Sequence, residues 1–121
     1  MPESIKILEG TDIIQITSYG KVTRRDLKKS SEEVYSICRD KGITKILVDA
    51  SRITERMPAI VAVEHGSYLA KNEIFRHAKH AFVIAENIYN NICVICICAF
   101  KRGVNIKSFV SKTDAIKWLN T

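Results

Sequence analysis

Short apolar runs separated by polar stretches divide this chain into alternating strands and helices. Strict alternation of apolar and polar residues indicates a strand, whereas apolar residues spaced three and four apart indicate a helix. The patterns predict five strands, at residues 5–9, 13–18, 45–49, 80–85 and 105–110. They also predict four helices, which begin at Thr23, near Pro58, near Asn87 and after Ser111. The order β-β-α-β-α-β-α-β-α requires a largely parallel sheet with helices packed on its faces.

Local signals support the first hairpin and the first helix. Gly10-Thr-Asp12 is a short, turn-rich gap between two strands, which favours an antiparallel hairpin. Thr23-Arg-Arg-Asp26 resembles a capping box, and Gly42 is typical of the residue that ends a helix. Leu27 and Val34 belong to an apolar stripe that small Ser30 and Ser31 flank. The second helix is predicted to bury one side, formed by Ile60, Val61, Tyr68, Leu69 and Phe75, with Gly66 as its weak point.

The segment 92–100 is ambiguous. Its β-branched residues favour a buried strand, whereas a possible cap at Asn87 and a stop at Gly103 favour a helix. A helix that is apolar all round must be covered on more than one side. We therefore expect a homodimer built on this helix, unless the rest of the same chain covers it. The expected interface residues are Tyr89, Ile92, Cys93, Cys96 and Phe100.

Polar residues follow the presumed parallel strands, where open α/β sheets bind their ligands. The candidate ligand-binding residues are Asp49, Ser51, Arg52, Glu86, Asn87 and Ser111. Two carboxylates among them disfavour a bare anion and favour an apolar or hydroxyl-bearing small molecule. The alternative is that these residues only cap helices and hold loops.

The sequence indicates no metal, cofactor or catalytic site. Cys93, Cys96 and Cys98 cannot converge on one ion in either a helix or a strand. The histidines, His65, His77 and His80, lack the four-residue spacing of a helical metal pair and are expected at the surface. Neither a nucleophile elbow nor a phosphate-binding glycine loop is present. We therefore predict that the protein is not an enzyme.

Composition indicates one ordinary globular domain spanning residues 1–121. Four cysteines in apolar patterns fit a reducing compartment, and the chain shows neither a secretory pattern nor a transmembrane stretch, so we expect a cytoplasmic protein. The net charge is +6, but the basic residues are spread out and aromatics make up only 7% of the chain. Nucleic-acid binders usually cluster basic residues and interleave aromatics, so we expect nucleic-acid binding, if any, to be weak and electrostatic.

Four segments in a fixed order carry a family resemblance. They are Gly20–Thr23, Ile46–Ser51, Arg102–Phe109 and Ala115–Leu119. Together they resemble the SpoIIAA-like family, which is related to STAS domains (sulfate transporter and anti-sigma factor antagonist). The resemblance implies a mixed five-stranded sheet whose first strand is antiparallel to the rest.

What the resemblance implies for function is a non-enzymatic module that acts through a protein partner or a small apolar ligand such as a lipid. Members of the family have been linked to lipid-binding CRAL-TRIO domains, to anti-sigma regulation and to binding of nucleotides or small anions. Two alternatives are a basic surface binder of nucleic acid or anionic membrane, and an anti-sigma-antagonist regulator. The last would lack its usual phosphoserine, because Ile53-Thr-Glu-Arg-Met-Pro58 has no hydroxyl where the helix starts and Thr54 lies too early.

Overall fold

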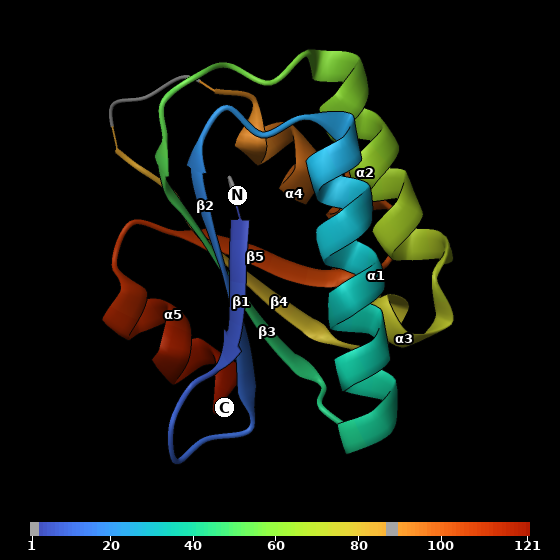
Figure 1. The fold of residues 1–121 in the computed structure, drawn as a ribbon, viewed down its shortest axis with the longest axis vertical. Helices are drawn as coiled ribbons and strands as arrows, with labels where there is room; N and C mark the ends of the chain where they lie inside the picture. The colour runs from blue at the N-terminus through green and yellow to red at the C-terminus, as the bar shows by residue number, and fades with distance from the viewer. Residues whose placement is uncertain (1–2, 87–89) are drawn as a thin grey trace.

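A five-stranded sheet in the order β1-β2-β3-β4-β5 runs through the centre of the molecule (Figure 1). The structure is a computed structural model that describes residues 3–86 and 90–121. The strands are β1 (Glu3–Ile7), β2 (Ile13–Gly20), β3 (Lys45–Ile53), β4 (Lys79–Val83) and β5 (Asn105–Phe109). β1 is antiparallel to β2, and the other neighbouring pairs are parallel. The predicted mixed sheet and its antiparallel first strand are confirmed.

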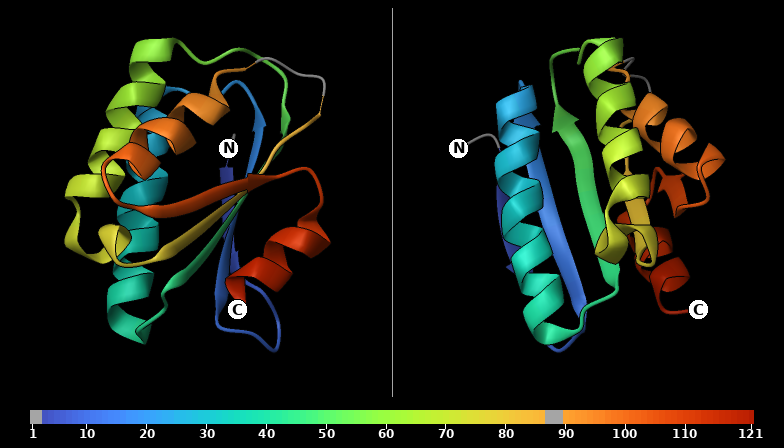
Figure 2. Two further views of the ribbon diagram at one scale, coloured as in Figure 1. Left: turned by 180° about the vertical axis from the view of Figure 1, so that it is seen from behind. Right: turned by 90° about the vertical axis from the view of Figure 1, so that its right-hand side faces the viewer.

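Three longer helices and a short fourth cover one face of the sheet, and one helix covers the other. α1 (Arg24–Lys41), α2 (Ala59–Lys71) and α4 (Ile92–Lys101) lie side by side over the first face (Figure 2). α5 (Lys112–Leu119) packs alone on the second face. The larger core lies under the three helices, and a smaller one lies under α5. The predicted layering of helices on both faces is therefore present.

The expected caps hold the ends of α1. The Thr23 hydroxyl accepts from the backbone N–H of Asp26, and the Asp26 carboxylate accepts from the N–H of Thr23 at 2.8 Å. Gly42 ends the helix with a left-handed φ of 66°, which a residue with a side chain adopts at a cost. Both predictions are confirmed because they depend only on neighbouring residues.

Strand β3 is longer than the sequence predicts. Asp49 is its last residue paired with β4, but the strand continues beside β2 as far as Ile53. The pairing of β2 with β3 shifts register in this extension. Ser51 and Arg52 therefore lie inside a strand that the sequence predicted to end at Asp49. The extra pairing partner, which lies far away in the sequence, explains the difference.

The predicted second helix is two helices. α2 ends before Asn72, whose backbone is extended, and a short α3 (Glu73–Arg76) follows. The Asn72 side chain accepts from the N–H groups of Ile74 and Phe75, so it starts the second helix as it ends the first. Two residues of the predicted buried side, Ile60 and Tyr68, are in fact exposed.

The ambiguous segment is a helix, α4, as its position favoured, but it begins at Ile92. The predicted cap, Asn87, and the interface residue Tyr89 lie outside the described residues. Asn91 precedes the helix with a left-handed φ of 66°, and its side-chain amide donates to the carbonyl of Met57 at 2.6 Å. That bond ties the start of α4 to the loop before α2.

Packing in the chain corrects the predicted interface on α4. Ile92 and Cys96 are buried against the sheet and α2, so neither is available to a second subunit. Cys93 and Phe100 are exposed as expected, together with Ile97. The exposed stripe of α4 is therefore Cys93, Ile97 and Phe100, and we call it the α4 stripe. Helical spacing alone could not decide which side would face the sheet.

Candidate ligand-binding site

The predicted ligand residues at the carboxyl ends of the strands are mostly engaged locally. One carboxylate oxygen of Asp49 accepts from the N–H of Ser51 at 3.1 Å and from its hydroxyl at 2.6 Å. Ser111 caps α5 by accepting from the N–H of Asp114 at 3.3 Å. Arg52 and Glu86 are exposed, and Asn87 lies outside the described residues. A ligand site at this edge stays a prediction.

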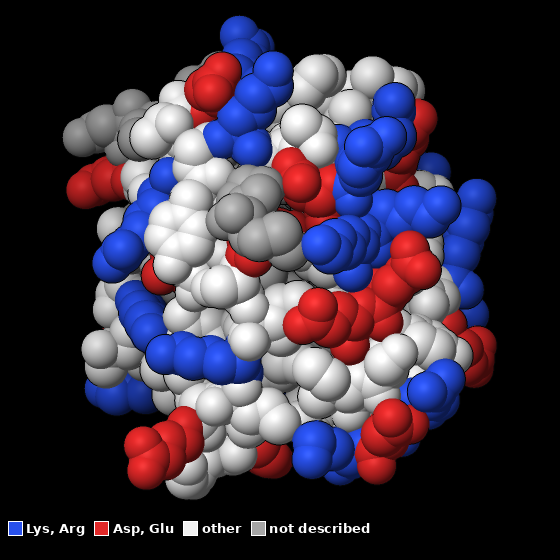
Figure 3. Space-filling model, viewed as in Figure 1, with Lys and Arg blue, Asp and Glu red and all other residues white. Residues whose placement is uncertain are grey.

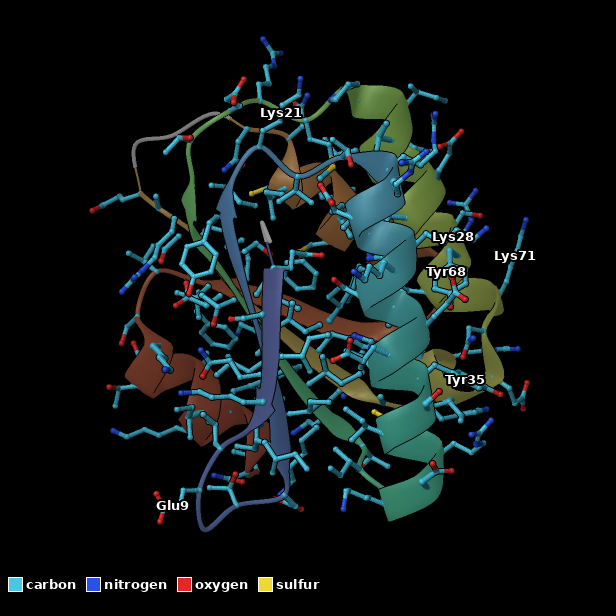
Figure 4. All side chains as sticks on the ribbon, viewed as in Figure 1. Glu9, Lys21, Lys28, Tyr35, Tyr68 and Lys71 are labelled. Carbon is cyan, nitrogen blue, oxygen red and sulfur yellow. The ribbon has the colours of Figure 1, made fainter. Side chains whose placement is uncertain are left out.

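A groove of about 220 Å³ opens elsewhere, between α1 and α2. Its walls are mainly apolar. Leu27, Val61 and Tyr68 contribute to them, beside the basic residues Arg24 and Lys28. The lining residues are Arg24, Leu27, Lys28, Ser31, Glu32, Val61, Glu64, His65 and Tyr68. Figure 4 shows Lys28 and Tyr68 close together on these two neighbouring helices. We call this feature the α1–α2 groove.

An ion pair joins the two helices at the rim of the groove. Arg24 on α1 donates from Nε to the Glu64 carboxylate on α2 at 2.7 Å. Both side chains are largely exposed, and exposed pairs of this kind typically stabilise a protein by less than about 1 kcal/mol. Such a contact can break at little cost, so it does not close the groove to a ligand.

Two smaller cavities lie beside the groove, toward the sheet. A second cavity of about 40 Å³ shares Leu27, Ser31 and His65 with the groove and extends to Glu3. A third, of about 30 Å³, shares Ser31 and His65 and reaches His80. Ser31 and His65 thus stand where the three spaces meet, between the surface and the core.

Glu3 lies beside the second cavity and supplies a polar group there. It lies opposite Ser18 in the antiparallel pairing of β1 with β2, and the Ser18 hydroxyl donates to Glu3 Oε2 at 2.6 Å. The Glu3 side chain is only 9% exposed, and its other oxygen, Oε1, is buried without a hydrogen-bond partner among the described residues. Burial raises the pKa of this carboxyl, and the hydroxyls of Ser18 and Ser30 offset part of the rise.

Of the two histidines near the groove, one is buried and the other is half-buried, contrary to the surface positions expected from the sequence. His80 on β4 is 1% exposed, and its Nε2 donates to the carbonyl of Phe75 at 2.7 Å. His65 on α2 is largely enclosed and stacks on Tyr68 with ring centres 6.1 Å apart. Burial lowers the pKa of each ring to about 4, so both are neutral at pH 7. Only His77 is exposed as expected.

The cysteines behave largely as the small apolar residues that the sequence indicated. Cys38, Cys96 and Cys98 are buried and unbridged, and burial raises the pKa of Cys96 to about 12. Cys93 is exposed on the α4 stripe. Within residues 3–86 and 90–121, no group of three or more metal-binding side chains is placed to hold an ion. In the same part of the chain, no helix is long and apolar enough to cross a membrane.

Sequence reasoning missed this site for a physical reason. Glu3 gave no signal, because glutamate side chains are rarely buried. His65 lies in a helix whose predicted buried side was only partly correct and did not include this residue. The available hint was the pair of small residues, Ser30 and Ser31, on the buried side of a helix, where they leave space that larger residues would fill.

Comparison with known proteins bears on the fold. No protein-family model and no curated protein sequence matches this chain. A crystal structure of an uncharacterised protein of the DUF3478 family from Shewanella loihica PV-4, described as having a SpoIIAA-like fold, superposes with a TM-score of 0.61. The similarity covers 97% of this chain and 91% of that protein, at 17% sequence identity. Together with the observed strand order, this shows that the chain has a SpoIIAA-like α/β fold.

Proposed function

We propose that this protein is a non-enzymatic module that binds a small apolar molecule, such as a lipid fragment, in the α1–α2 groove. The observation that carries the proposal is an open apolar groove that shares Leu27, Ser31 and His65 with a smaller cavity beside Glu3, whose Oε1 is buried without a hydrogen-bond partner among the described residues. Small-molecule sites are typically concave and apolar, with a few polar groups that orient the ligand. Typical sites measure roughly 300–1,000 Å³, so a groove of about 220 Å³ suits a ligand below drug size.

The proposal assigns no reaction to the site. A serine nucleophile needs a base within hydrogen-bond reach. In the described part of the chain, His65 makes no hydrogen bond to Ser31 or to another side chain that would activate it. The α1–α2 groove places a few polar side chains beside an apolar space, which suits the binding of an apolar ligand.

The alternative functions gain less support. Acidic and basic side chains are interspersed on the face drawn in Figure 3, where a binder of phosphate backbones would present one sign of charge. The start of α2 has Pro58 at its cap position and no side-chain cap, so a phosphorylated hydroxyl of the anti-sigma-antagonist type has no counterpart there. Groove binding is therefore the function to test first.

Binding of an uncharged apolar fluorophore tests the proposed function. We expect N-phenyl-1-naphthylamine to gain fluorescence on titration with the protein, with a dissociation constant in the micromolar range. Ser31→Leu should weaken this binding at least tenfold. Ser31 lines the α1–α2 groove and both smaller cavities, and a leucine side chain would fill space in them. The measurement is fluorescence titration, accompanied by thermal unfolding to confirm that the variant is folded.

Ser36→Leu is the matched control. Ser36 lies on the same helix, outside the α1–α2 groove, and its hydroxyl only donates to the carbonyl of Glu32. This variant should bind the probe within twofold of the wild type. A wild-type protein that does not bind the probe, or equal weakening in both variants, would rule out the groove as the site.

We propose in addition that the protein forms a homodimer through the α4 stripe. Ile97 and Phe100 are 55% and 67% exposed, and burying such side chains fully is worth roughly 1.5–3 kcal/mol each. A two-fold contact between copies covers the same stripe on both subunits at once. The proposed interface therefore uses the exposed Ile97 and Phe100. Ile92 and Cys96, which the sequence predicted for it, are buried within the chain.

Sedimentation equilibrium tests the dimer. At tens of micromolar we expect the wild type to have twice the chain mass of 13.7 kDa. An Ile97→Lys, Phe100→Lys variant should sediment as a monomer, because two charges would then have to enter the contact. Ile60→Lys, at a comparably exposed position on α2, should stay dimeric. A monomeric wild type would refute the proposal.

A further inference from the structure

Beside the α1–α2 groove lies a buried carboxylate oxygen, Glu3 Oε1, that accepts no hydrogen bond of ordinary geometry from the described residues; the Ser30 hydroxyl is near enough to lower the pKa of this carboxyl but does not complete such a bond. Glu3 Oε2 is occupied by the Ser18 hydroxyl, whereas Oε1 is buried without a partner among residues 3–86 and 90–121. A buried polar atom left unpaired destabilises the folded protein, and more so when it carries charge. In its ionised form a carboxylate oxygen can only accept, so the partner that completes ionised Glu3 is a donor.

The size of the inner cavity limits what that donor can be. The space beside Glu3 measures about 40 Å³, against about 220 Å³ for the α1–α2 groove. Only a small part of a ligand that occupies the groove can therefore enter this space, and a hydroxyl group is small enough to do so. The rest of that cavity is lined mainly by apolar side chains such as Ile16, Val48 and Phe82, so the part of the ligand behind the donor must be apolar.

We propose that the ligand is an apolar molecule that carries a hydrogen-bond donor, of the alcohol class, and that Glu3 Oε1 accepts from that donor. This inference rests on the proposed function, because the alcohol reaches Glu3 through the α1–α2 groove. The apolar chain lies along Leu27 and Val61, and the hydroxyl passes Ser31 and His65 on its way inward. A carboxylate head group is disfavoured beside ionised Glu3, since two negative charges would then meet.

Two isomers of equal size and charge test the assignment. 1-Octanol and heptyl methyl ether have the same formula, but only the alcohol carries a donor. Each is used to displace N-phenyl-1-naphthylamine from the wild type at pH 8, where we expect the alcohol to act at a concentration at least fivefold below that of the ether. Equal displacement, or preference for the ether, overturns the inference while leaving the groove itself as a binding site.

Glu3→Gln tests whether Glu3 is the group that selects the donor. The glutamine oxygen can keep the bond from Ser18, which places the amide N–H₂, a donor, where Oε1 was. The preference for octanol over the ether should then fall to twofold or less. Glu33→Gln, an exposed change of the same kind on α1, should keep the wild-type preference.

The outcomes separate the two proposals. If the wild type does not bind the naphthylamine probe, both the groove and its alcohol ligand are refuted. If the probe binds and Glu3→Gln retains the full preference for octanol, the groove stands and the role of Glu3 is refuted. The comparison of isomers on the wild type needs no variant, so it decides the ligand class even if Glu3→Gln does not fold.

Discussion

Replacing Gly66 with alanine should lower the free energy of unfolding by roughly 1–3 kcal/mol, although alanine is the better helix former by about 1 kcal/mol. Gly66 lies where α2 crosses α4. A Cβ atom added there would stand 2.8 Å from the Cβ of Cys98 and 2.8 Å from the carbonyl oxygen of Ile95. The backbone of α4 cannot yield as a flexible side chain would, so the two helices must separate. Chemical denaturation of the variant measures the loss.

Ser67→Ala is the control for this substitution. It adds alanine at the next position of α2, which carries no hydrogen bond from its side chain, and should change stability by less than about 0.5 kcal/mol. Alanine in place of glycine normally stabilises an unstrained helix. A Gly66→Ala protein as stable as the wild type would therefore show that the two helices are not in close contact at this position.

Acid should destabilise the protein between pH 6.5 and pH 4 through its buried histidines. The pKa of His80 is lowered from 6.5 to about 4 by burial, so the unfolded chain takes up a proton on this ring before the folded protein does. The stability from the neutral ring is complete above pH 6.5 and is lost as the pH falls toward 4. The shift corresponds to on the order of 3 kcal/mol for His80, and His65 adds to it in the same direction.

Denaturation curves across this pH range check the prediction. His80→Gln keeps a donor for the Phe75 carbonyl but does not titrate, so its stability should fall less steeply with acid than that of the wild type. His77→Gln alters an exposed histidine and should leave the slope unchanged. Glu3 works in the opposite sense, because a raised carboxyl pKa costs stability as pH rises through it. A wild-type profile flat from pH 6.5 to 4 would contradict the assignment to the histidines.

The sequence by itself determined the alternation of strands and helices and several of their ends, although it joined α2 and α3 into one helix and ended β3 too early. The capping pair Thr23 and Asp26, the left-handed Gly42 and the turn at Gly10 each act through residues a few positions apart. Such local preferences are encoded in the neighbouring residues and do not depend on the rest of the fold. The alternation of strands and helices in turn fixed the parallel sheet, since parallel neighbours require crossover connections.

The tertiary structure alone decided features that depend on distant partners. β3 extends to Ile53 because β2 continues beside it, and α2 tolerates Gly66 because α4 packs directly on its backbone. The side of α4 that faces the sheet likewise followed from its neighbours, since an apolar helix has no polar face to orient it.

The candidate site also depends on residues that are distant in the sequence. Glu3 and Ser18 meet through strand pairing, and two helices that follow later in the chain enclose them with Ser31 and His65. Each of these residues looks ordinary when it is taken singly. Glu3 is a glutamate on a strand, Ser31 is a small helical residue and His65 is an isolated histidine. Their combination into a groove with one unused acceptor arises only from packing, because burial is what turns an ordinary carboxylate into a group that lacks a partner.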